Sequence, residues 1–272
     1  MSLCAKNISL QLGGNKILSD VSINLEQGQV TALLGCNGAG KSSLLKIMAG
    51  DLHASSGTVS LDGKALTDYR PVELAKRRAV LTQKSTLSFA FPVYQVVEMG
   101  AAHRALARAE KRRLIQLLLR LTGTEQLTLR DYTSLSGGEQ QRVHFARTLA
   151  QLWTQASDME PILILDEPVA ALDFAWQQRV LEITQWLAHK KQWSVLVVLH
   201  DMNQAAMYAD NIYLLKDGSC LCQGTPNNTL VQEHLNKAFG VLSHVQQHPL
   251  LSERPHIIPI RADLPPIEHY LE

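Results

Sequence analysis

The sequence predicts an α/β fold built around a parallel sheet, on three observations. Residues 162–165 and 195–199 are near-continuous apolar runs, as expected of parallel strands covered on both faces. The helix-prone residues 174–190 lie between them, which is the alternation typical of an α/β domain. Residues 30–34 form another strand pattern, and a glycine-rich turn joins it to a helical pattern over residues 41–49.

The first part of the chain predicts a smaller antiparallel side sheet. Residues 4–10 and 17–25 have the pattern of half-buried strands, and residues 58–61 and 79–82 are further strand candidates. The middle of the chain differs, because residues 88–157 contain no convincing strand pattern. Helical patterns cover residues 93–100, 108–121 and 137–152. We therefore expect an all-helical insertion within the α/β core.

These patterns predict three segments. The core is discontinuous and comprises residues 1–87 and 158–240, while residues 88–157 form the helical subdomain. Residues 241–272 are expected to be a C-terminal tail with little independent structure. Prolines crowd this tail, among them Pro255, Pro259, Pro265 and Pro266.

The composition is that of an ordinary globular protein. Of 272 residues, 46% are hydrophobic and 19% are charged, which excludes wholesale disorder. The 26 basic and 25 acidic residues leave a net charge of +1. The chain therefore has no strong field with which to hold a nucleic-acid backbone or anionic lipid non-specifically.

The chain also has no evident membrane span or secretion signal. A membrane-spanning helix needs about 20 consecutive apolar residues, and the apolar runs here are far shorter. Residues 1–7 have no apolar signal core. Any membrane role is therefore expected to come through a partner. The four cysteines are too few for a disulfide scaffold and predict reduced, buried thiols.

A phosphate-binding loop follows the strand pattern of residues 30–34. The sequence matches the pattern of glycine, four residues, glycine, lysine and serine. The string is Gly35-Cys36-Asn37-Gly38-Ala39-Gly40-Lys41-Ser42, with Ser43 next in the helix. Glycines let backbone N–H groups turn toward phosphate oxygens, and the helix N-terminus adds its positive dipole end. The lysine supplies a charge for the β- and γ-phosphates, and Ser42 can ligate Mg²⁺. The loop predicts nucleoside triphosphate binding.

Two carboxylates end the apolar run of residues 162–165. Asp166 would lie at the carboxyl end of a buried strand beside the phosphate-binding loop, where it can hold Mg²⁺. Glu167 can orient and deprotonate the water that attacks the γ-phosphate. If no phosphate-binding loop lay upstream, a plain Asp-Glu turn before Pro168 would be the alternative interpretation of these two residues.

A second anion site is predicted in the helical insertion. Its string is Leu135-Ser136-Gly137-Gly138-Glu139-Gln140-Gln141-Arg142. Ser136 and Glu139 have capping-box spacing, so a helix begins here. Gly137 and Gly138 bare the N–H groups of its first turn to an incoming anion. A single nucleotide is not expected to use both anion sites of the same chain. This points to two chains that share each nucleotide.

Together these motifs resemble the ATP-binding subunits of ABC transporters. The resemblance covers about residues 3–240 and includes the phosphate-binding loop, the signature string, Asp166-Glu167 and His200 after an apolar strand, in that order. It implies a RecA-like P-loop core, a helical subdomain that carries the signature, and a head-to-tail dimer with two ATPs at its interface.

The resemblance also assigns roles to single residues. It places Gln83 where the family has a glutamine that contacts Mg²⁺ or the attacking water, and His200 where a histidine contacts the γ-phosphate. Asp173 matches a residue that crosses the dimer interface. Ser136, Gly137 and Gly138 would bind the γ-phosphate of the ATP held by the partner.

Two residues depart from the family pattern. Leu12 stands where an aromatic side chain often stacks on adenine, which predicts weaker base selectivity. Cys36 stands where proline is frequent, at a position that the loop pattern leaves open, so ATP binding is expected to survive.

Further strings are similar to the branch of importers for iron chelates, heme and cobalamin. They are residues 91–100 and residues 200–210. Within that branch, residues 80–89 and 149–153, followed by a short polar insert at 154–160, resemble hemin-import ATPases. Uptake of ferric siderophores or cobalamin is the alternative. His103 and His144 are expected to be surface or packing residues, because the substrate passes through the permease.

The resemblance implies a homodimer on a polytopic permease, in two copies, at the cytoplasmic face of a bacterial inner membrane. A periplasmic substrate-binding protein would act indirectly through the permease, and no nucleic acid is expected. A lipoprotein or amino-acid importer keeps the same chemistry with another cargo. A soluble ABC ATPase that acts on DNA or ribosomes fits less well, since this chain has neither long coiled-coil arms nor a second such domain.

Overall fold

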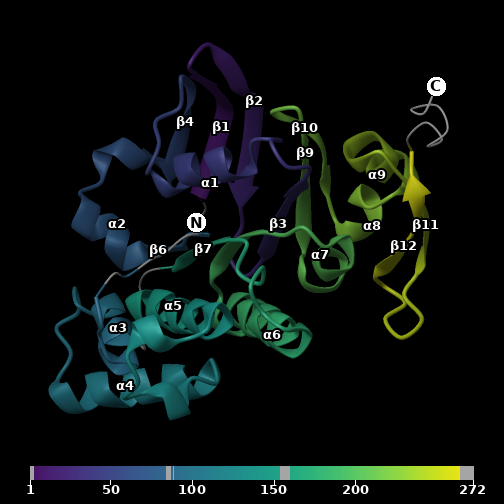
Figure 1. The fold of residues 1–272 in the computed structure, drawn as a ribbon. Helices are drawn as coiled ribbons and strands as arrows, with labels where there is room; N and C mark the ends of the chain where they lie inside the picture. Colours follow the sequence, from purple (N-terminus) through teal and green to yellow (C-terminus); the bar gives the residue numbers. More distant parts are fainter. Residues whose placement is uncertain (1–2, 84–86, 88, 154–159, 264–272) are drawn as a thin grey trace.

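The computed structural model describes residues 3–83, 87, 89–153 and 160–263. Within these residues the chain forms a six-stranded sheet, a four-stranded sheet, a helical subdomain and a C-terminal hairpin (Figure 1). The predicted α/β class with an antiparallel side sheet and a helical insertion is confirmed. The predicted boundary near residue 157 and the prolines at 265 and 266 lie outside the described residues.

The six-stranded sheet forms the centre of the core. Its strand order is β10-β9-β3-β8-β7-β6, and all neighbours except β10 and β9 run parallel. The strands are β3 (Val30–Gly35), β6 (Arg78–Leu81), β7 (Ile162–Asp166), β8 (Ser194–Val198), β9 (Asn211–Lys216) and β10 (Ser219–Gly224). Every residue of β3, β7 and β8 is buried, as their apolar runs predict. The strands β9 and β10 were not predicted.

The antiparallel side sheet has the order β2-β1-β4-β5. Its strands are β1 (Leu3–Leu12), β2 (Asn15–Leu25), β4 (Ser56–Leu61) and β5 (Lys64–Ala65). The helix α1 (Lys41–Ala49) packs between this sheet and one face of the central sheet, where Leu44 and Met48 are fully buried. A short helix, α2 (Pro71–Arg77), leads into β6.

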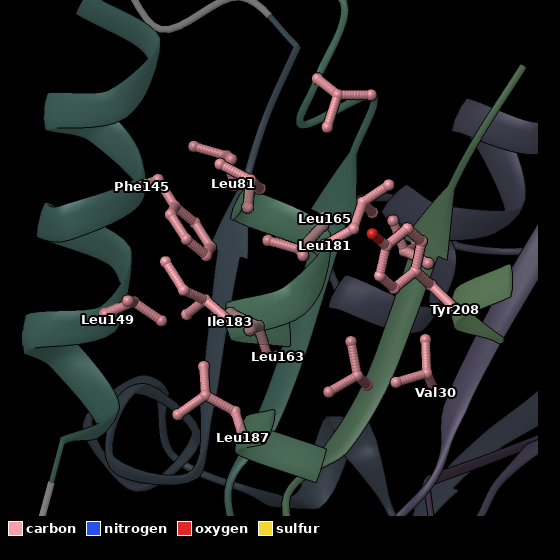
Figure 2. Close-up of a cluster of buried hydrophobic side chains, with 14 of the residues drawn as sticks. Val30, Leu81, Phe145, Leu149, Leu163, Leu165, Leu181, Ile183, Leu187 and Tyr208 are labelled. Carbon is pink, nitrogen blue, oxygen red and sulfur yellow. The ribbon is translucent and has the colours of Figure 1, made fainter. Parts of the chain in front are cut away.

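The opposite face of the central sheet is covered by α5 (Gly137–Leu152) and α6 (Phe174–Lys191). Figure 2 shows Phe145 and Leu149 of α5 and Leu181 of α6 packed around Leu163 and Leu165 of β7. The helices α3 (Val93–Gly100) and α4 (Arg108–Leu121) complete the helical subdomain. All three predicted helices of the insertion are therefore present. The helices α1 and α5 pack on opposite faces of the sheet. The sheet therefore lies between the helix of the phosphate-binding loop and the helix of the signature string.

The C-terminal region is more ordered than predicted. The helices α7 (Met202–Tyr208), α8 (Pro226–Thr229) and α9 (Gln232–Phe239) precede an antiparallel hairpin of β11 (Val241–Gln247) and β12 (Pro255–Ala262). The expected structureless tail is therefore wrong for residues 241–262. Pro255 begins its strand, and Pro259 lies at a register shift in a two-stranded ribbon, both positions at which a missing N–H is tolerated.

Candidate ATP site

The predicted catalytic residues lie at one edge of the central sheet. The phosphate-binding loop follows β3, His200 follows β8, and Gln83 follows β6. Asp166 is the last residue of β7, and Glu167 comes next. Because these four strands are parallel neighbours in the sheet, their carboxyl ends form a single edge, which is where α/β folds bind ligands. Sheet topology thus brings together residues that are up to 165 positions apart in the chain.

The phosphate-binding loop is wound around its own lysine. The ammonium of Lys41 donates hydrogen bonds to the carbonyl oxygens of Gly35, at 2.7 Å, and of Cys36, at 2.9 Å. Burial lowers the pKa of Lys41, and the charges of Glu167, Cys36 and Asp166 oppose that shift. Gly40 has a φ of +95°, and a Cβ there would come within 2.6 Å of Leu18. The loop conformation therefore requires glycine at this position.

Asp166 is a buried carboxylate with unused hydrogen-bonding capacity. It is 4% exposed, and it accepts a hydrogen bond from the side chain of Ser42. Its Oδ1 atom is buried without a hydrogen-bond partner among the described residues. Burial raises the pKa of Asp166, and the neighbouring Glu167 charge raises it further. An unsatisfied, anionic oxygen next to a serine hydroxyl is a donor set that suits Mg²⁺.

Glu167 links two of the other predicted catalytic side chains. Its Oε2 accepts a hydrogen bond from Gln83 Nε2 at 2.7 Å, and its Oε1 lies 2.7 Å from His200 Nε2. Its backbone has a φ of +50°, a left-handed conformation that is rare for a residue with a side chain. Such local strain is typical of functional sites, and here it accompanies a carboxylate held between two polar groups.

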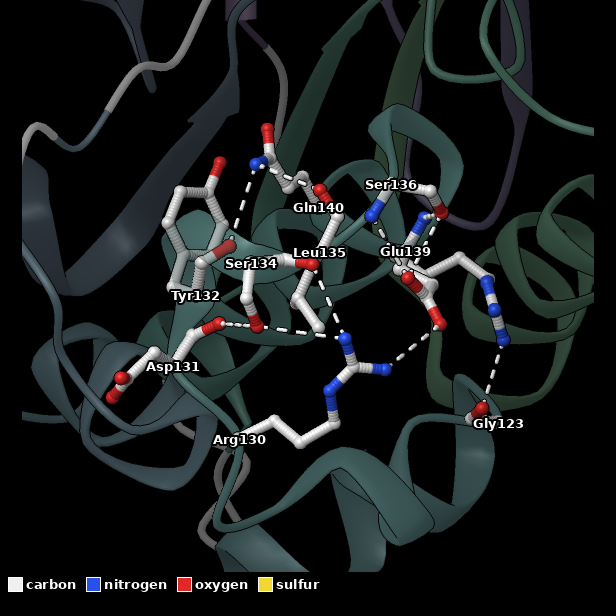
Figure 3. Close-up of polar contacts among 10 residues, drawn as sticks. Gly123, Arg130, Asp131, Tyr132, Ser134, Leu135, Ser136, Glu139 and Gln140 are labelled. Carbon is white, nitrogen blue, oxygen red and sulfur yellow. Dashed lines mark hydrogen bonds and ion pairs between the residues drawn. The ribbon is translucent and has the colours of Figure 1, made fainter.

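The signature helix α5 begins as the capping box predicts. Ser136 Oγ accepts a hydrogen bond from the Glu139 N–H, and the Glu139 carboxylate accepts one from the Ser136 N–H at 2.8 Å (Figure 3). Arg130 donates to the carbonyl oxygen of Ser134 and lies 3.9 Å from the Glu139 carboxylate. A Cβ at Gly137 would meet no atom within 4 Å, so the helix N-terminus is open to a ligand.

Asp173 caps the next helix. Its Oδ1 accepts a hydrogen bond from the N–H of Trp176 at 3.0 Å and so begins α6. A Cβ at Gly138 would come within 3.0 Å of the Ala171 carbonyl oxygen, so the segment that ends at Asp173 lies against the N-terminus of α5. The structure thus divides the predicted nucleotide-binding residues between two surfaces of the chain.

Three residues to which the sequence patterns assigned no role connect these parts: Gln141, Arg142 and Trp176. Gln141 donates a hydrogen bond to the carbonyl oxygen of Pro168, directly after Glu167. The Arg142 guanidinium lies 4.2 Å above the Trp176 ring and donates to the carbonyl oxygen of Gly123. The only sequence signal for these contacts was the polar end of the signature string, residues 139–142. The residues that it contacts are distant in the sequence.

The remaining single-residue predictions have mixed outcomes. His144 is a packing residue, as expected, since it is buried and its Nε2 lies 2.6 Å from the Tyr132 hydroxyl. The cysteines are free, as expected, but the predicted burial is wrong, because Cys36 is exposed and the other three are only partly buried. Its thiol donates to the carbonyl oxygen of Ala238 in α9. Leu12 is 47% exposed at the end of β1.

The fold and the site together define a nucleotide-binding ATPase of the P-loop class. Residues 18–170 match the family model described as ABC transporter. The chain belongs to the ABC transporter family, as an ATP-binding and ATP-hydrolysing domain of it. The resemblance seen in the sequence motifs is therefore confirmed.

Several curated relatives span nearly the whole chain. The hemin import ATP-binding protein HmuV of Gloeobacter violaceus is 43% identical over 260 residues, which cover 95% of this chain and 94% of that protein. The protein of the same name from Vibrio anguillarum is 43% identical and covers 94% of this chain and 97% of its own length.

Solved structures show the same architecture. A metal-chelate type ABC transporter in an inward-facing conformation has a TM-score of 0.77 at 26% identity, covering 95% of this chain and 97% of that one. The dimeric structure of the bacterial ABC transporter cassette MJ0796 has a TM-score of 0.73 at 26% identity, covering 83% of this chain and 99% of that one. Among the described residues of this chain, no helix is both long and apolar enough to cross a membrane.

Proposed function

We propose that this chain is the ATP-hydrolysing subunit of an inner-membrane ABC importer that powers the uptake of heme. The convergence of the phosphate-binding loop, Asp166, Glu167 and His200 at one sheet edge carries the ATPase part of the proposal. The cargo is supported by relatives named as hemin import proteins, which match this chain over more than nine-tenths of its length.

ATP is held by the loop of residues 35–43, whose N–H groups and Lys41 ammonium face the β- and γ-phosphates. A bound triphosphate replaces the loop carbonyls as the partner of the Lys41 ammonium, and its negative charge favours the charged form that burial disfavours. Ser42, Asp166 and Gln83 would hold Mg²⁺. The orphaned Oδ1 of Asp166 supports this set. When bound, the ion neutralises charge on the phosphates.

Glu167 acts as the general base for the attacking water. In the nucleotide-free chain its two oxygens are engaged by Gln83 and His200, so the carboxylate is already oriented by neighbours on both sides. We propose that nucleotide binding frees one oxygen for the water and turns His200 toward the γ-phosphate. Gln83 then reports occupancy of the site to the helical subdomain, which begins a few residues later in the chain.

The signature residues complete the site of a second copy. Within one chain, α1 and α5 lie on opposite faces of the central sheet, so Ser136, Gly137 and Gly138 are separated from the loop of residues 35–43. In a head-to-tail homodimer the open end of α5 meets the γ-phosphate held by the partner, and Asp173 crosses the interface. Closure on two ATPs then brings the two helical subdomains together.

The homodimer docks on a polytopic permease in two copies, at the cytoplasmic face of the bacterial inner membrane. The permease contacts the helical subdomain near residues 83–100, so closure of the dimer alternates access across the membrane. A periplasmic heme-binding protein delivers the cargo to the permease and acts on this chain only indirectly. No heme ligand is assigned to this chain.

A mixing experiment tests the shared site. Lys41→Ala disables the phosphate-binding loop, and Gly137→Asp places a repelling carboxylate where the γ-phosphate would sit. Gly137→Asp is expected to fold, because the position is open and a helix N-terminus favours an anion. Each variant alone should be inactive, whereas their heterodimer contains one intact site and one doubly disabled site. Recovered ATP occlusion in the mixture supports the shared site, and its absence contradicts it.

The cargo is tested by transport. We expect proteoliposomes containing the chain and its permease to take up heme in an ATP-dependent manner, and Lys41→Ala to abolish uptake. Ferric siderophore and cobalamin are the matched competitors. Preferential uptake of either competitor would reassign the cargo and leave the ATPase assignment intact.

A further inference from the structure

Phe174 is a bulky apolar side chain that the fold of a single chain leaves in solvent. It is the first residue of α6, directly after Asp173, and it is 76% exposed. Isolated apolar side chains on a surface are ordinary. Phe174 differs from them in two respects. Its backbone is held by several contacts, and it lies on the same surface as the N-terminus of the signature helix.

The first turn of α6 is anchored on two sides. Asp173 caps it through the Trp176 N–H, and the Trp176 ring packs under the Arg142 guanidinium of the signature helix. Gln177 donates to the carbonyl oxygen of Leu172 and accepts a hydrogen bond from Gln204 of α7. The turn is therefore tied to the signature helix and to the helix that follows His200.

Helix geometry then sets the direction of Phe174. Successive residues are rotated by about 100°, so Phe174 and Trp176 project from nearly opposite sides of α6. Trp176 faces the helical subdomain, where a Cβ at Gly123 would come within 2.0 Å of its ring. Phe174 is consequently directed away from that subdomain. An aromatic side chain on a rigid turn loses little conformational entropy when a partner buries it.

Phe174 also lies on the same surface as the open end of the signature helix. Ala171 contacts that end, because a Cβ at Gly138 would come within 3.0 Å of the Ala171 carbonyl oxygen. Ala170, Ala171 and Asp173 are exposed, as is Phe174. We call this surface the signature rim and define it as residues 136–138 and 170–174. Leu172 is buried, and the exposed residues of the rim are polar or small except for Phe174.

We propose that Phe174 is an apolar anchor of the homodimer, buried against a second copy of this chain when ATP closes the interface. The proposal rests on the head-to-tail dimer described above and adds a residue to it. The second copy is the occupant, since the signature rim is continuous with the surface that meets the partner's ATP. Aromatic residues near the centre of interfaces carry a large share of the binding free energy.

Sedimentation of the full chain tests the anchor. Glu167→Gln in MgATP provides the parent dimer, and Phe174→Ala is introduced into it. We expect the dimer Kd to rise about 30-fold or more, because a dimer loses two anchors. Phe174→Leu should recover most of the affinity. Phe89→Ala is the matched control, since Phe89 is 72% exposed but lies outside the signature rim. It should leave the dimer Kd unchanged.

Two further measurements separate the possible outcomes. ATP affinity and thermal unfolding of the nucleotide-free chain should be the same with and without Phe174→Ala, since the side chain is exposed. A photoreactive phenylalanine analogue at position 174 should crosslink to a second copy only in MgATP. A parent dimer that forms equally well with Phe174→Ala would overturn the anchor alone. Failure of the parent to dimerise in MgATP would overturn both the anchor and the proposed dimer.

Discussion

Glu167 is constrained both in its backbone and in its side chain. Its backbone is left-handed, and its carboxylate is held between Gln83 and His200. Glu167→Gln keeps the size of the side chain, but it replaces one acceptor oxygen by an NH2 donor and cannot accept a proton. We expect ATP binding to be retained and the hydrolysis rate to fall by about 10² to 10⁴. Single-turnover hydrolysis checks this, and an unchanged rate would remove Glu167 from the role of base.

Asp166 is predicted to lower the stability of the nucleotide-free chain at neutral pH. Burial raises the pKa of Asp166, so the folded state holds this proton at pH values where the unfolded state has released it. The cost is absent well below the unfolded pKa, grows between the unfolded and the folded pKa, and is complete above the folded pKa. Asp166→Asn removes the charge, so the variant should gain thermal stability relative to wild type as pH rises from 4 to 7.

The control for Asp166 is Asp68→Asn, which changes a carboxylate on the surface of the chain. It should leave the difference between pH 4 and pH 7 unchanged. A matching pH dependence in Asp166→Asn and wild type would show that Asp166 does not carry this cost. Asp166→Asn should also lose Mg²⁺-dependent hydrolysis, which separates its functional effect from its stability effect.

At the scale of elements, the C-terminal hairpin is attached to the helix that follows His200. Asn203 of α7 donates to the carbonyl oxygen of Ile257 at 3.0 Å and accepts from its N–H at 2.8 Å. Ile257 is almost fully buried. This amide therefore pairs with β12 as a neighbouring strand would, and it satisfies backbone groups that water cannot reach.

Asn203→Ala should detach the hairpin. Two hydrogen bonds are lost, and the buried backbone of Ile257 is left unpaired, so we expect a loss of about 1–3 kcal/mol in the free energy of unfolding of this region. Hydrogen exchange over residues 255–262 should accelerate. Gln246→Ala, at an exposed position of β11, is the control and should leave exchange unchanged. Equal protection in both variants would contradict the role of Asn203.

At the scale of the whole molecule, the ATP site couples ligand binding to stability. A ligand that binds only the folded chain stabilises it by RT ln(1 + [L]/Kd), or about 2.7 kcal/mol at a hundredfold excess over Kd. We expect MgATP to raise the melting temperature of Glu167→Gln and to have little effect once Lys41→Ala is added. An equal shift in both proteins would mean that ATP binds somewhere other than the loop of residues 35–43.

The sequence by itself determined the elements that have a local pattern. The apolar runs of β3, β7 and β8, the capping box of α5 and the glycine spacing of the phosphate-binding loop are short-range features, and each was present where predicted. Motif order also identified the family, because the joint occurrence of several functional strings is specific even when each alone is not.

Only the tertiary structure decided which distant residues meet. The Arg142 contact with Trp176, the Asn203 pair with Ile257 and the Cys36 contact with α9 join residues that no local periodicity relates. The hairpin was missed because prolines disfavour strands on average, whereas β-pairing at a strand end or register shift tolerates them. The separation of α1 and α5 by the sheet is likewise a property of packing, and it supports the proposal that two chains share each ATP site.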